Sequence, residues 1–71
     1  MKFVLIHSEY IKLDQFLKLA DCVSTGGMAK ALLEEEAVKV NQEIEQRRGR
    51  KLYAGDTVEV EGHGVFQVKA E

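Results

Sequence analysis

A cluster of cations between residues 47 and 51 is the segment of this chain with the clearest chemistry. The run Arg47-Arg48-Gly49-Arg50-Lys51 holds four of the ten Lys and Arg residues, and the other six lie among twelve acidic residues. Guanidinium groups make paired hydrogen bonds to phosphate, and Gly49 gives the backbone freedom to turn the arginines toward one side. We therefore predict that this run binds nucleic-acid phosphates, and a merely solvated loop is the alternative. The net charge of −2 limits indiscriminate binding to polyanions.

A second candidate anion site lies at residues 25–30. The first N–H groups of a helix have no partner within the helix, and Gly26 and Gly27 would let a phosphate approach them closely. Thr25 can cap this turn or donate its hydroxyl to the phosphate, and Lys30 reaches the same region from about one turn further along. The alternative is that the two glycines only permit tight helix packing.

Tyr53 follows the basic run by two residues and has two possible roles. Exposed tyrosines stack on unpaired bases in RNA recognition. A tyrosine beside a strand more often packs against its neighbours. The sequence favours packing, with stacking as the alternative.

The residues that could support other chemistry do not form a recognisable site. His7, Cys22 and His63 are the only soft metal ligands, and none has a partner at the spacing of a metal site. No nucleophile, base and oxyanion hole occur together in the pattern. We therefore predict no metal, no cofactor and no enzymatic activity. Cys22 is expected to be a small buried hydrophobic residue, and His63 to be exposed.

Length and composition set the scale of the fold. The chain has 71 residues, of which 45% are hydrophobic and 31% charged, and this predicts a single domain over residues 1–71. The apolar stretch Phe3-Val4-Leu5-Ile6 is too short to cross a membrane and lacks the layout of a signal peptide. One cysteine cannot form an internal disulfide. We expect a monomer in the cytoplasm with no membrane partner.

Hydrophobic periodicity predicts the elements that hold these residues. Residues 2–7 and 38–40 read as strands, and residues 57–61 and 65–68 as the two strands of a hairpin. Apolar residues at helical spacing predict helices from about 13 to 21 and from about 26 to 35. The order predicts an α+β fold in which two helices pack on a small, mainly antiparallel sheet.

The order of these segments resembles the S4 RNA-binding domain. The segments that carry the resemblance are Lys12-Leu13-Asp14-Gln15-Phe16-Leu17, Thr25 through Ala29-Lys30-Ala31-Leu32-Leu33, Val38-Lys39-Val40-Asn41 and Gly55-Asp56-Thr57-Val58. Within the family, residues 25–30 and 47–52 most resemble the stand-alone YaaA/YbcJ-like S4 proteins.

The resemblance implies both a fold and a partner. It implies the alpha-L arrangement of S4 domains, with a core motif at about residues 11–60, an N-terminal strand at 2–7 and a C-terminal hairpin at 57–69. It also implies structured RNA as the partner, with ribosomal RNA or the ribosome as one case, bound through the paired helices and the adjoining basic loop. Lys12 stands where many S4 domains have arginine, so it is expected to support phosphate binding or to be a solvated helix start.

Three positions depart from the family's pattern. Gly26 replaces an arginine at the start of the second helix, Glu36 a glycine at its end, and Gln42 a glycine in the following hairpin. If Glu36 adopts a positive φ, its side chain carries a steric cost that glycine avoids. These departures put the geometry of the RNA contacts in question more than the fold.

Three functions remain open from the sequence. The first is non-catalytic binding of structured RNA, and nothing in the pattern separates RNA from DNA. The second is a protein-interaction adaptor, on the ribosome for example, that uses the basic loop and the exposed edge of the strand at residues 3–6. The third is a β-grasp sulfur carrier, which ranks last because the chain ends in Lys69-Ala70-Glu71 and not in the Gly-Gly that this chemistry requires.

Overall fold

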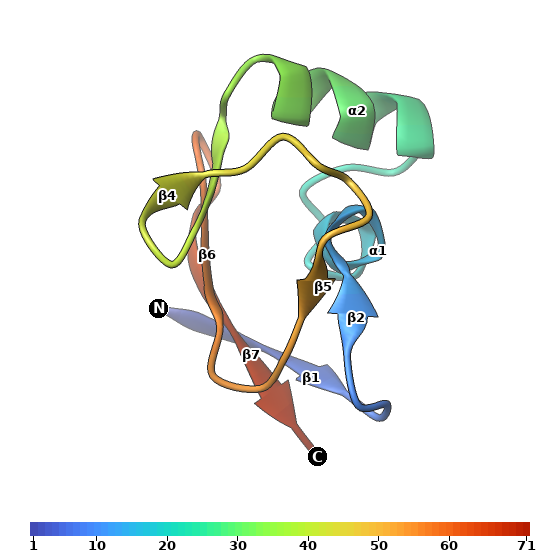
Figure 1. Cartoon of the computed structure of the whole chain (residues 1–71), viewed down its shortest axis with the longest axis vertical. Coiled ribbons are helices and arrows are strands. Elements are labelled where there is room, and N and C mark those ends of the chain that lie inside the picture. The colour runs from blue at the N-terminus through green and yellow to red at the C-terminus, as the bar shows by residue number, and fades with distance from the viewer.

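A computed structural model describes all residues from 1 to 71 and contains two helices and seven strands (Figure 1). The helices are α1 (Leu13–Leu19) and α2 (Gly26–Glu34). The strands are β1 (Lys2–Ile6), β2 (Ile11–Lys12), β3 (Val38–Val40), β4 (Glu43–Ile44), β5 (Lys51–Leu52), β6 (Thr57–Val60) and β7 (Gly64–Ala70). Neither helix has the length and hydropathy needed to cross a membrane.

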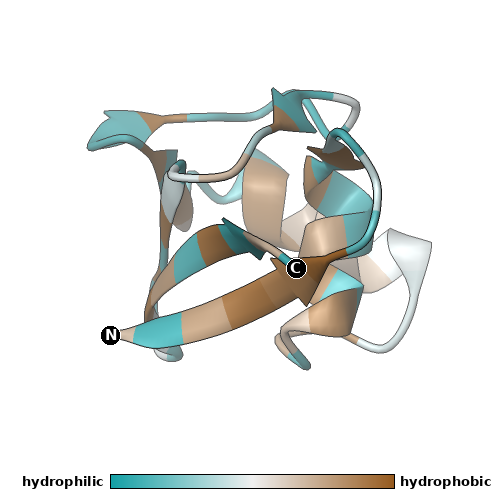
Figure 2. Ribbon diagram, turned by 90° about the horizontal axis from the view of Figure 1, so that it is seen from below, coloured by the Kyte–Doolittle hydropathy of each residue, from teal (hydrophilic) through white to brown (hydrophobic).

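Five of the strands form one sheet in the order β1-β7-β6-β3-β4. Only the pairing of β1 with β7 is parallel, and the other neighbours are antiparallel. Figure 2 shows β1 and β7 running side by side, with β1 hydrophobic along most of its length. Strands β2 and β5 form a separate antiparallel ribbon. The predicted α+β class, with two helices and a mainly antiparallel sheet, is confirmed.

Alternating residues of the sheet face the helices and form the core. Val38 and Val40 of β3 and Val58 and Val60 of β6 are almost fully buried, as the period-two pattern of a half-buried strand requires. Helix α1 contributes Phe16, whose ring meets that of Phe66 of β7 edge-on at a centroid distance of 6.2 Å. The core contains sixteen buried residues in all, and Leu52 of the β2–β5 ribbon is one of them. The ribbon is therefore anchored to the same core as the main sheet.

The predicted element boundaries need small corrections. Helix α1 ends at Leu19 and not near Asp21, because Asp21 adopts a φ of 63°, which a right-handed helix does not allow. Helix α2 ends one residue earlier than predicted, at Glu34, and β7 continues to Ala70. The strands β2, β4 and β5 were not predicted. Each has only two residues, which is too short for a periodic pattern to show.

Three residues between the end of α2 and β4 adopt a left-handed backbone conformation. Asn41 and Gln42 join β3 to β4 with φ values of 50° and 74°, which are the two positive angles of a type I′ hairpin turn. Glu36, just beyond the end of α2, has a φ of 59°. Asparagine tolerates this region, whereas Gln42 and Glu36 occupy positions that favour glycine.

Candidate nucleic-acid interface

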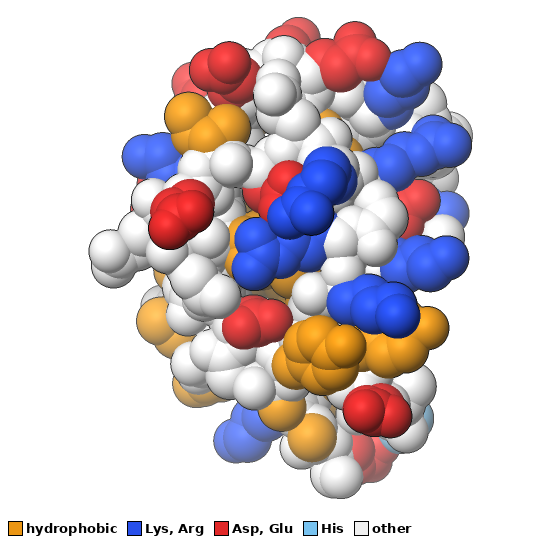
Figure 3. All heavy atoms as spheres, in the orientation of Figure 1, with side chains coloured by type: hydrophobic (Ala, Val, Ile, Leu, Met, Phe, Trp, Pro, Cys, Tyr) orange, Lys and Arg blue, Asp and Glu red, His pale blue; other side chains and the backbone are white.

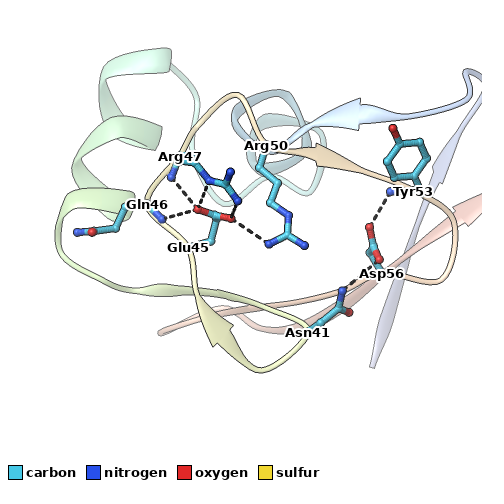
Figure 4. A network of polar contacts seen from close by, with 7 residues as sticks. All are labelled: Asn41, Glu45, Gln46, Arg47, Arg50, Tyr53 and Asp56. Atoms are coloured by element: carbon cyan, nitrogen blue, oxygen red, sulfur yellow. Dashed lines mark hydrogen bonds and ion pairs between the residues drawn. The ribbon is translucent and has the colours of Figure 1, made fainter.

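The basic loop is the segment 45–51, which follows β4 and contains the basic run. The buried carboxylate of Glu45 holds this loop in shape (Figure 4). Its Oε2 accepts hydrogen bonds from the backbone N–H groups of Gln46 and Arg47, both at 3.0 Å, and from Nε of Arg47 at 3.1 Å. Its Oε1 accepts from Nη2 of Arg47 and from Nη1 of Arg50, both at 2.9 Å. These five bonds hold the chain in a turn between β4 and β5.

The contacts of Glu45 change its acidity and that of its partner. The side-chain hydrogen bonds from Arg47 are the largest influence, and with the backbone N–H of Arg47 and the guanidinium of Arg50 they lower the pKa of Glu45 to about 2. Burial of the carboxyl acts in the opposite direction and is outweighed. The same hydrogen bonds raise the pKa of Arg47. Glu45 is therefore a permanent anion beside the arginines at neutral pH.

The basic run consists of two kinds of cation, which the sequence did not distinguish. The side chain of Arg50 is only 30% exposed and is turned inward to Glu45. Arg47 is 76% exposed and uses two of its five N–H donors on the carboxylate, so the others face solvent. Arg48 and Lys51 are exposed and take part in no ion pair. These two cations are the ones most available to phosphate.

The backbone of the basic loop also holds the start of α1. The N–H groups of Leu13 and Asp14 donate to the carbonyl oxygens of Arg50 and Arg48, at 2.8 and 3.0 Å. These two bonds satisfy N–H groups that a helix start leaves unpaired, and Lys12 at the N-cap provides no side-chain cap. The basic loop and α1 are therefore joined through the main chain.

Lys30 and Arg48 are brought together by the fold. With Leu33, Glu34 and Gln46 they line a shallow hollow between α2 and the basic loop. Lys30 lies 3.8 Å from Glu34 in an exposed pair one turn apart, which is a weak contact at that exposure. The hollow thus joins one predicted site residue of α2 to the basic run.

The start of α2 has the cap that the sequence predicted. Thr25 Oγ1 accepts a hydrogen bond from the N–H of Met28 at 3.1 Å. A Cβ atom at Gly26 would meet no other atom within 4 Å, and one at Gly27 would meet only the Thr25 hydroxyl at 3.9 Å. Tight helix packing therefore does not explain the two glycines. No hydrogen bond or ion pair joins this turn to the basic run.

The ribbon of β2 and β5 gives each of the two remaining predicted site residues, Lys12 and Tyr53, a neighbour of its own kind. Lys12 lies directly opposite Lys51, and Tyr53 lies beside Tyr10 with ring centroids 6.0 Å apart. The predicted packing of Tyr53 is thus present, although its side chain remains 45% exposed. Figure 3 shows that Lys and Arg side chains gather over the segment after β4 and over β5 and β2, with apolar side chains directly below them.

Two residues of this surface were missed by sequence reasoning. Glu45 stands two positions before the arginines, and an acid at that spacing is a signal for a local ion pair that the count of cations concealed. Tyr10 becomes a neighbour of Tyr53 only through the pairing of β2 with β5, which the sequence pattern did not predict. The position of Glu45 is set by a turn and that of Tyr10 by a strand register, and neither residue belongs to a sequence motif that could have revealed it.

The remaining reactive groups lie apart from the basic surface. Cys22 is buried, as predicted, and burial raises the pKa of its thiol. His63 is exposed, as predicted, in the connection between β6 and β7, and the imidazole of His7 contacts the carboxylate of Glu71. No three His, Cys, Asp or Glu side chains are close enough together to hold a metal ion.

Comparison with known proteins places this geometry in a family. The profile of the family described as S4 domain matches residues 4–69. The chain is 62% identical over 63 residues to the "Probable ribosome maturation protein RlbA" of Bacillus subtilis, and the match covers 89% of each chain. It is 38% identical over 56 residues to the "Putative RNA-binding protein YbcJ" of Escherichia coli, covering 79% of this chain and 80% of that one. This small α+β protein, with its paired helices and adjoining basic loop, belongs to the S4 domain family.

Proposed function

We propose that this protein binds structured RNA without catalysing a reaction, through the surface formed by the basic loop, the β2–β5 ribbon and the start of α2. One observation carries the proposal most directly. Three cations that take part in no ion pair, Lys12, Arg48 and Lys51, lie on two segments that the fold holds together, since Lys12 and Lys51 are cross-strand partners. Such cations have no internal anion to displace before they bind phosphate.

The printed names of the two relatives support the same function. One is named for ribosome maturation and the other for RNA binding, and both names describe proteins without a stated reaction. We extend these names to a finer proposal, in which the RNA is ribosomal and the protein acts as a monomer in the cytoplasm. The whole chain from 1 to 71 is proposed to act as a single RNA-binding domain, with no cofactor.

The remaining predicted residues have defined parts in the proposal. Arg47 keeps unused donors for phosphate, whereas Arg50 mainly fixes the loop by its contact with Glu45. Lys30 adds a contact from the hollow that it shares with Arg48. Thr25, Gly26 and Gly27 offer open N–H groups at the first turn of a nine-residue helix.

A salt series tests the proposal. Fluorescence anisotropy measures the affinity of a labelled ribosomal RNA hairpin for the wild type and for Arg48→Ala/Lys51→Ala. The slope of log affinity against log salt is expected to become shallower by up to about 1.8, or roughly 0.9 for each lost duplex contact. Lys39→Ala is the matched control, because Lys39 is an exposed lysine on β3, outside this surface. Equal slopes for the wild type and the double variant would contradict the proposal, and a matched DNA duplex measures the preference for RNA.

One observation favours a second candidate function, the protein-interaction adaptor. Strand β1 lies at the edge of the five-stranded sheet, and its residues Phe3 and Leu5 are more than half exposed. Unpaired edges of this kind can accept a strand from another protein. If Leu5→Lys abolishes association with ribosomal particles while RNA affinity stays unchanged, the adaptor function explains the association. If the association persists in this variant, RNA binding explains it.

A further inference from the structure

The β2–β5 ribbon has two chemically different faces. Ile11 pairs with Leu52 in the antiparallel register, and both pack on the core. Because side chains alternate along a strand, the flanking residues project to the opposite face. On that face Lys12 stands opposite Lys51, and the tyrosine pair Tyr10 and Tyr53 lies two residues further along the ribbon. The outer face therefore carries one cationic pair beside one aromatic pair.

The two aromatic side chains of this face form a small platform. The rings of Tyr10 and Tyr53 have centroids 6.0 Å apart and planes inclined at 49°. Neither ring belongs to the sixteen-residue core, and neither hydroxyl makes a hydrogen bond within the protein. The two rings therefore pack on one another outside the core, and the 45% exposure of Tyr53 leaves part of this pair open to solvent.

The backbone beneath the platform is fixed by a polar network (Figure 4). The N–H of Tyr53 donates to Oδ2 of Asp56 at 2.8 Å, and Oδ1 of Asp56 accepts from Nδ2 of Asn41 at 3.1 Å. Asn41 is itself held, because its Oδ1 accepts from the N–H of Thr57 at 3.0 Å. A ring whose backbone is already positioned loses less conformational entropy when a ligand stacks on it.

The cationic pair makes the platform suitable for a nucleotide. Lys51 Nζ lies 4.8 Å from the centre of the Tyr10 ring, which is within the range of a cation–π contact. Two lysines directly opposite one another repel, and neither takes part in an ion pair with a carboxylate. A bound phosphate would relieve that repulsion. Residues two apart on a strand are separated by about 7 Å, so the base and the phosphate of one nucleotide can both be engaged.

We propose that this face binds one unpaired nucleotide, whose base stacks on the exposed ring of Tyr53 beside Tyr10 and whose phosphate lies between Lys12 and Lys51. The proposal rests on RNA binding and narrows the ligand to folded RNA that presents a loop, bulge or end, rather than an uninterrupted duplex. The basic loop binds the adjoining backbone, and the ribbon selects the place where a base is free. Stacking tolerates every base, so the selection is for structure and not for sequence.

The experiment compares two RNAs and three variants. One RNA is a blunt duplex, and the other is the same duplex with a single bulged 2-aminopurine, whose fluorescence reports stacking. The wild type and the variants Tyr53→Leu and Tyr10→Leu are titrated with both. Phe3→Leu is the matched control, because Phe3 on β1 is also an exposed aromatic residue with a lysine over its ring, Lys69 at 5.1 Å. If Tyr10→Leu does not fold, Tyr53→Leu decides, since its ring is half exposed and outside the core.

We expect the wild type to bind the bulged RNA roughly 5- to 150-fold more tightly than the duplex, the range of one stacked base. Tyr53→Leu should lose this preference and the change in 2-aminopurine fluorescence, while its affinity for the blunt duplex and the behaviour of Phe3→Leu stay as in the wild type. Equal binding of both RNAs by the wild type and by Tyr53→Leu would overturn this inference and leave the proposed RNA binding intact. Binding of neither RNA would overturn both.

Discussion

Arg50 donates to the buried carboxylate of Glu45 at 2.9 Å from a position five residues further along the chain, and this contact closes the basic loop from inside. The loop therefore has a shape before any ligand arrives. Its four cations and one internal carboxylate keep a net charge of +3, and the carboxylate fixes where Arg47 and Arg50 can lie. A surface arranged in advance binds with less loss of entropy than a free loop would.

Glu45 should make the stability of the protein sensitive to acid. Its pKa falls from an ordinary value of about 4.3 in the unfolded chain to about 2 in the folded protein. The stabilisation is therefore fully present above about pH 4.3 and is lost as the pH falls toward 2.

We expect Glu45→Gln to lower the free energy of unfolding at pH 7 by about 1–3 kcal/mol, and to flatten its pH dependence below pH 4.3. Urea unfolding followed by circular dichroism from pH 7 to pH 2.5 measures both. Glu43→Gln, an exposed carboxyl two residues earlier, is the control, and an equal effect of the two substitutions would contradict the role of Glu45.

Arg48 and Arg50 should differ sharply although only one residue separates them. Arg50→Ala removes a partner of the buried carboxylate and should cost about 1–2 kcal/mol of stability, since Arg47 still pairs with it. Arg48→Ala removes an exposed cation with no ion pair, so its stability should stay within about 0.5 kcal/mol of the wild type. RNA affinity should show the reverse order, with the larger change in salt slope for Arg48→Ala. Urea unfolding and anisotropy on the same samples check this, and a larger loss of stability in Arg48→Ala would refute the division of the run into two kinds of cation.

Glu36→Gly should stabilise the protein. Glu36 has a φ of 59°, and relief of a left-handed conformation is worth about 1 kcal/mol, partly offset by the greater freedom of glycine in the unfolded chain. The substitution also removes an acid from the negative end of the α2 dipole. The thermal midpoint should rise by a few degrees. Glu35→Gly is the control, because Glu35 has a φ of −78°, and there glycine should give no gain.

The glycines at the start of α2 allow a test that separates folding from binding. Gly26→Ala/Gly27→Ala adds methyl groups into open space, so the stability should be unchanged or should rise by up to about 1 kcal/mol. If a phosphate docks on this turn, the same methyl groups obstruct it, and the affinity for RNA should fall. Thermal unfolding and anisotropy measure the two effects. An undiminished affinity would remove this turn from the interface and leave the basic loop as the main site.

Cys22 should react slowly with thiol reagents while the protein is folded. Burial raises the pKa of its thiol, so less thiolate is present at any given pH than in the unfolded chain. We expect labelling by a disulfide reagent at pH 8 to be slow in buffer and rapid in denaturing urea. Rapid labelling in buffer would show that the segment between α1 and α2 opens readily.

Most of the helices and strands could be predicted from the sequence, because each buries one face and exposes the other. The alternation at Val38–Val40 and the helical spacing of Leu13, Phe16 and Leu17 record which face meets the core, so both elements were predicted at nearly the right place. The strands β2, β4 and β5 have two residues each and leave no such record. The pairing of β2 with β5 is decided by contacts between segments about forty residues apart, such as Ile11 with Leu52. Strand β4 pairs with its neighbour β3 across the turn at Asn41 and Gln42.

The sequence predicted which residue types the candidate site contains, but not how their side chains are arranged. The excess of cations at residues 47–51 is visible in the sequence, and so are the glycines that follow Thr25. Whether a given arginine faces solvent or an internal carboxylate depends on the turn that carries Glu45, and the sequence pattern does not specify that turn. Tyr10 shows the same limit, because its partner is set by a strand register.

The parallel pairing of β1 with β7 has a consequence for how the protein is made. Strand β1 is synthesised before the other strands of the sheet, and its only partner in the sheet is β7, which follows it by about sixty residues, as the pairing of Lys2 with Phe66 shows. During translation the apolar residues Val4 and Ile6 therefore lack their sheet partners until β7 has been synthesised. The helices and the hairpin of β3 and β4 can form earlier from local contacts, but the sheet is completed only after β7 has left the ribosome.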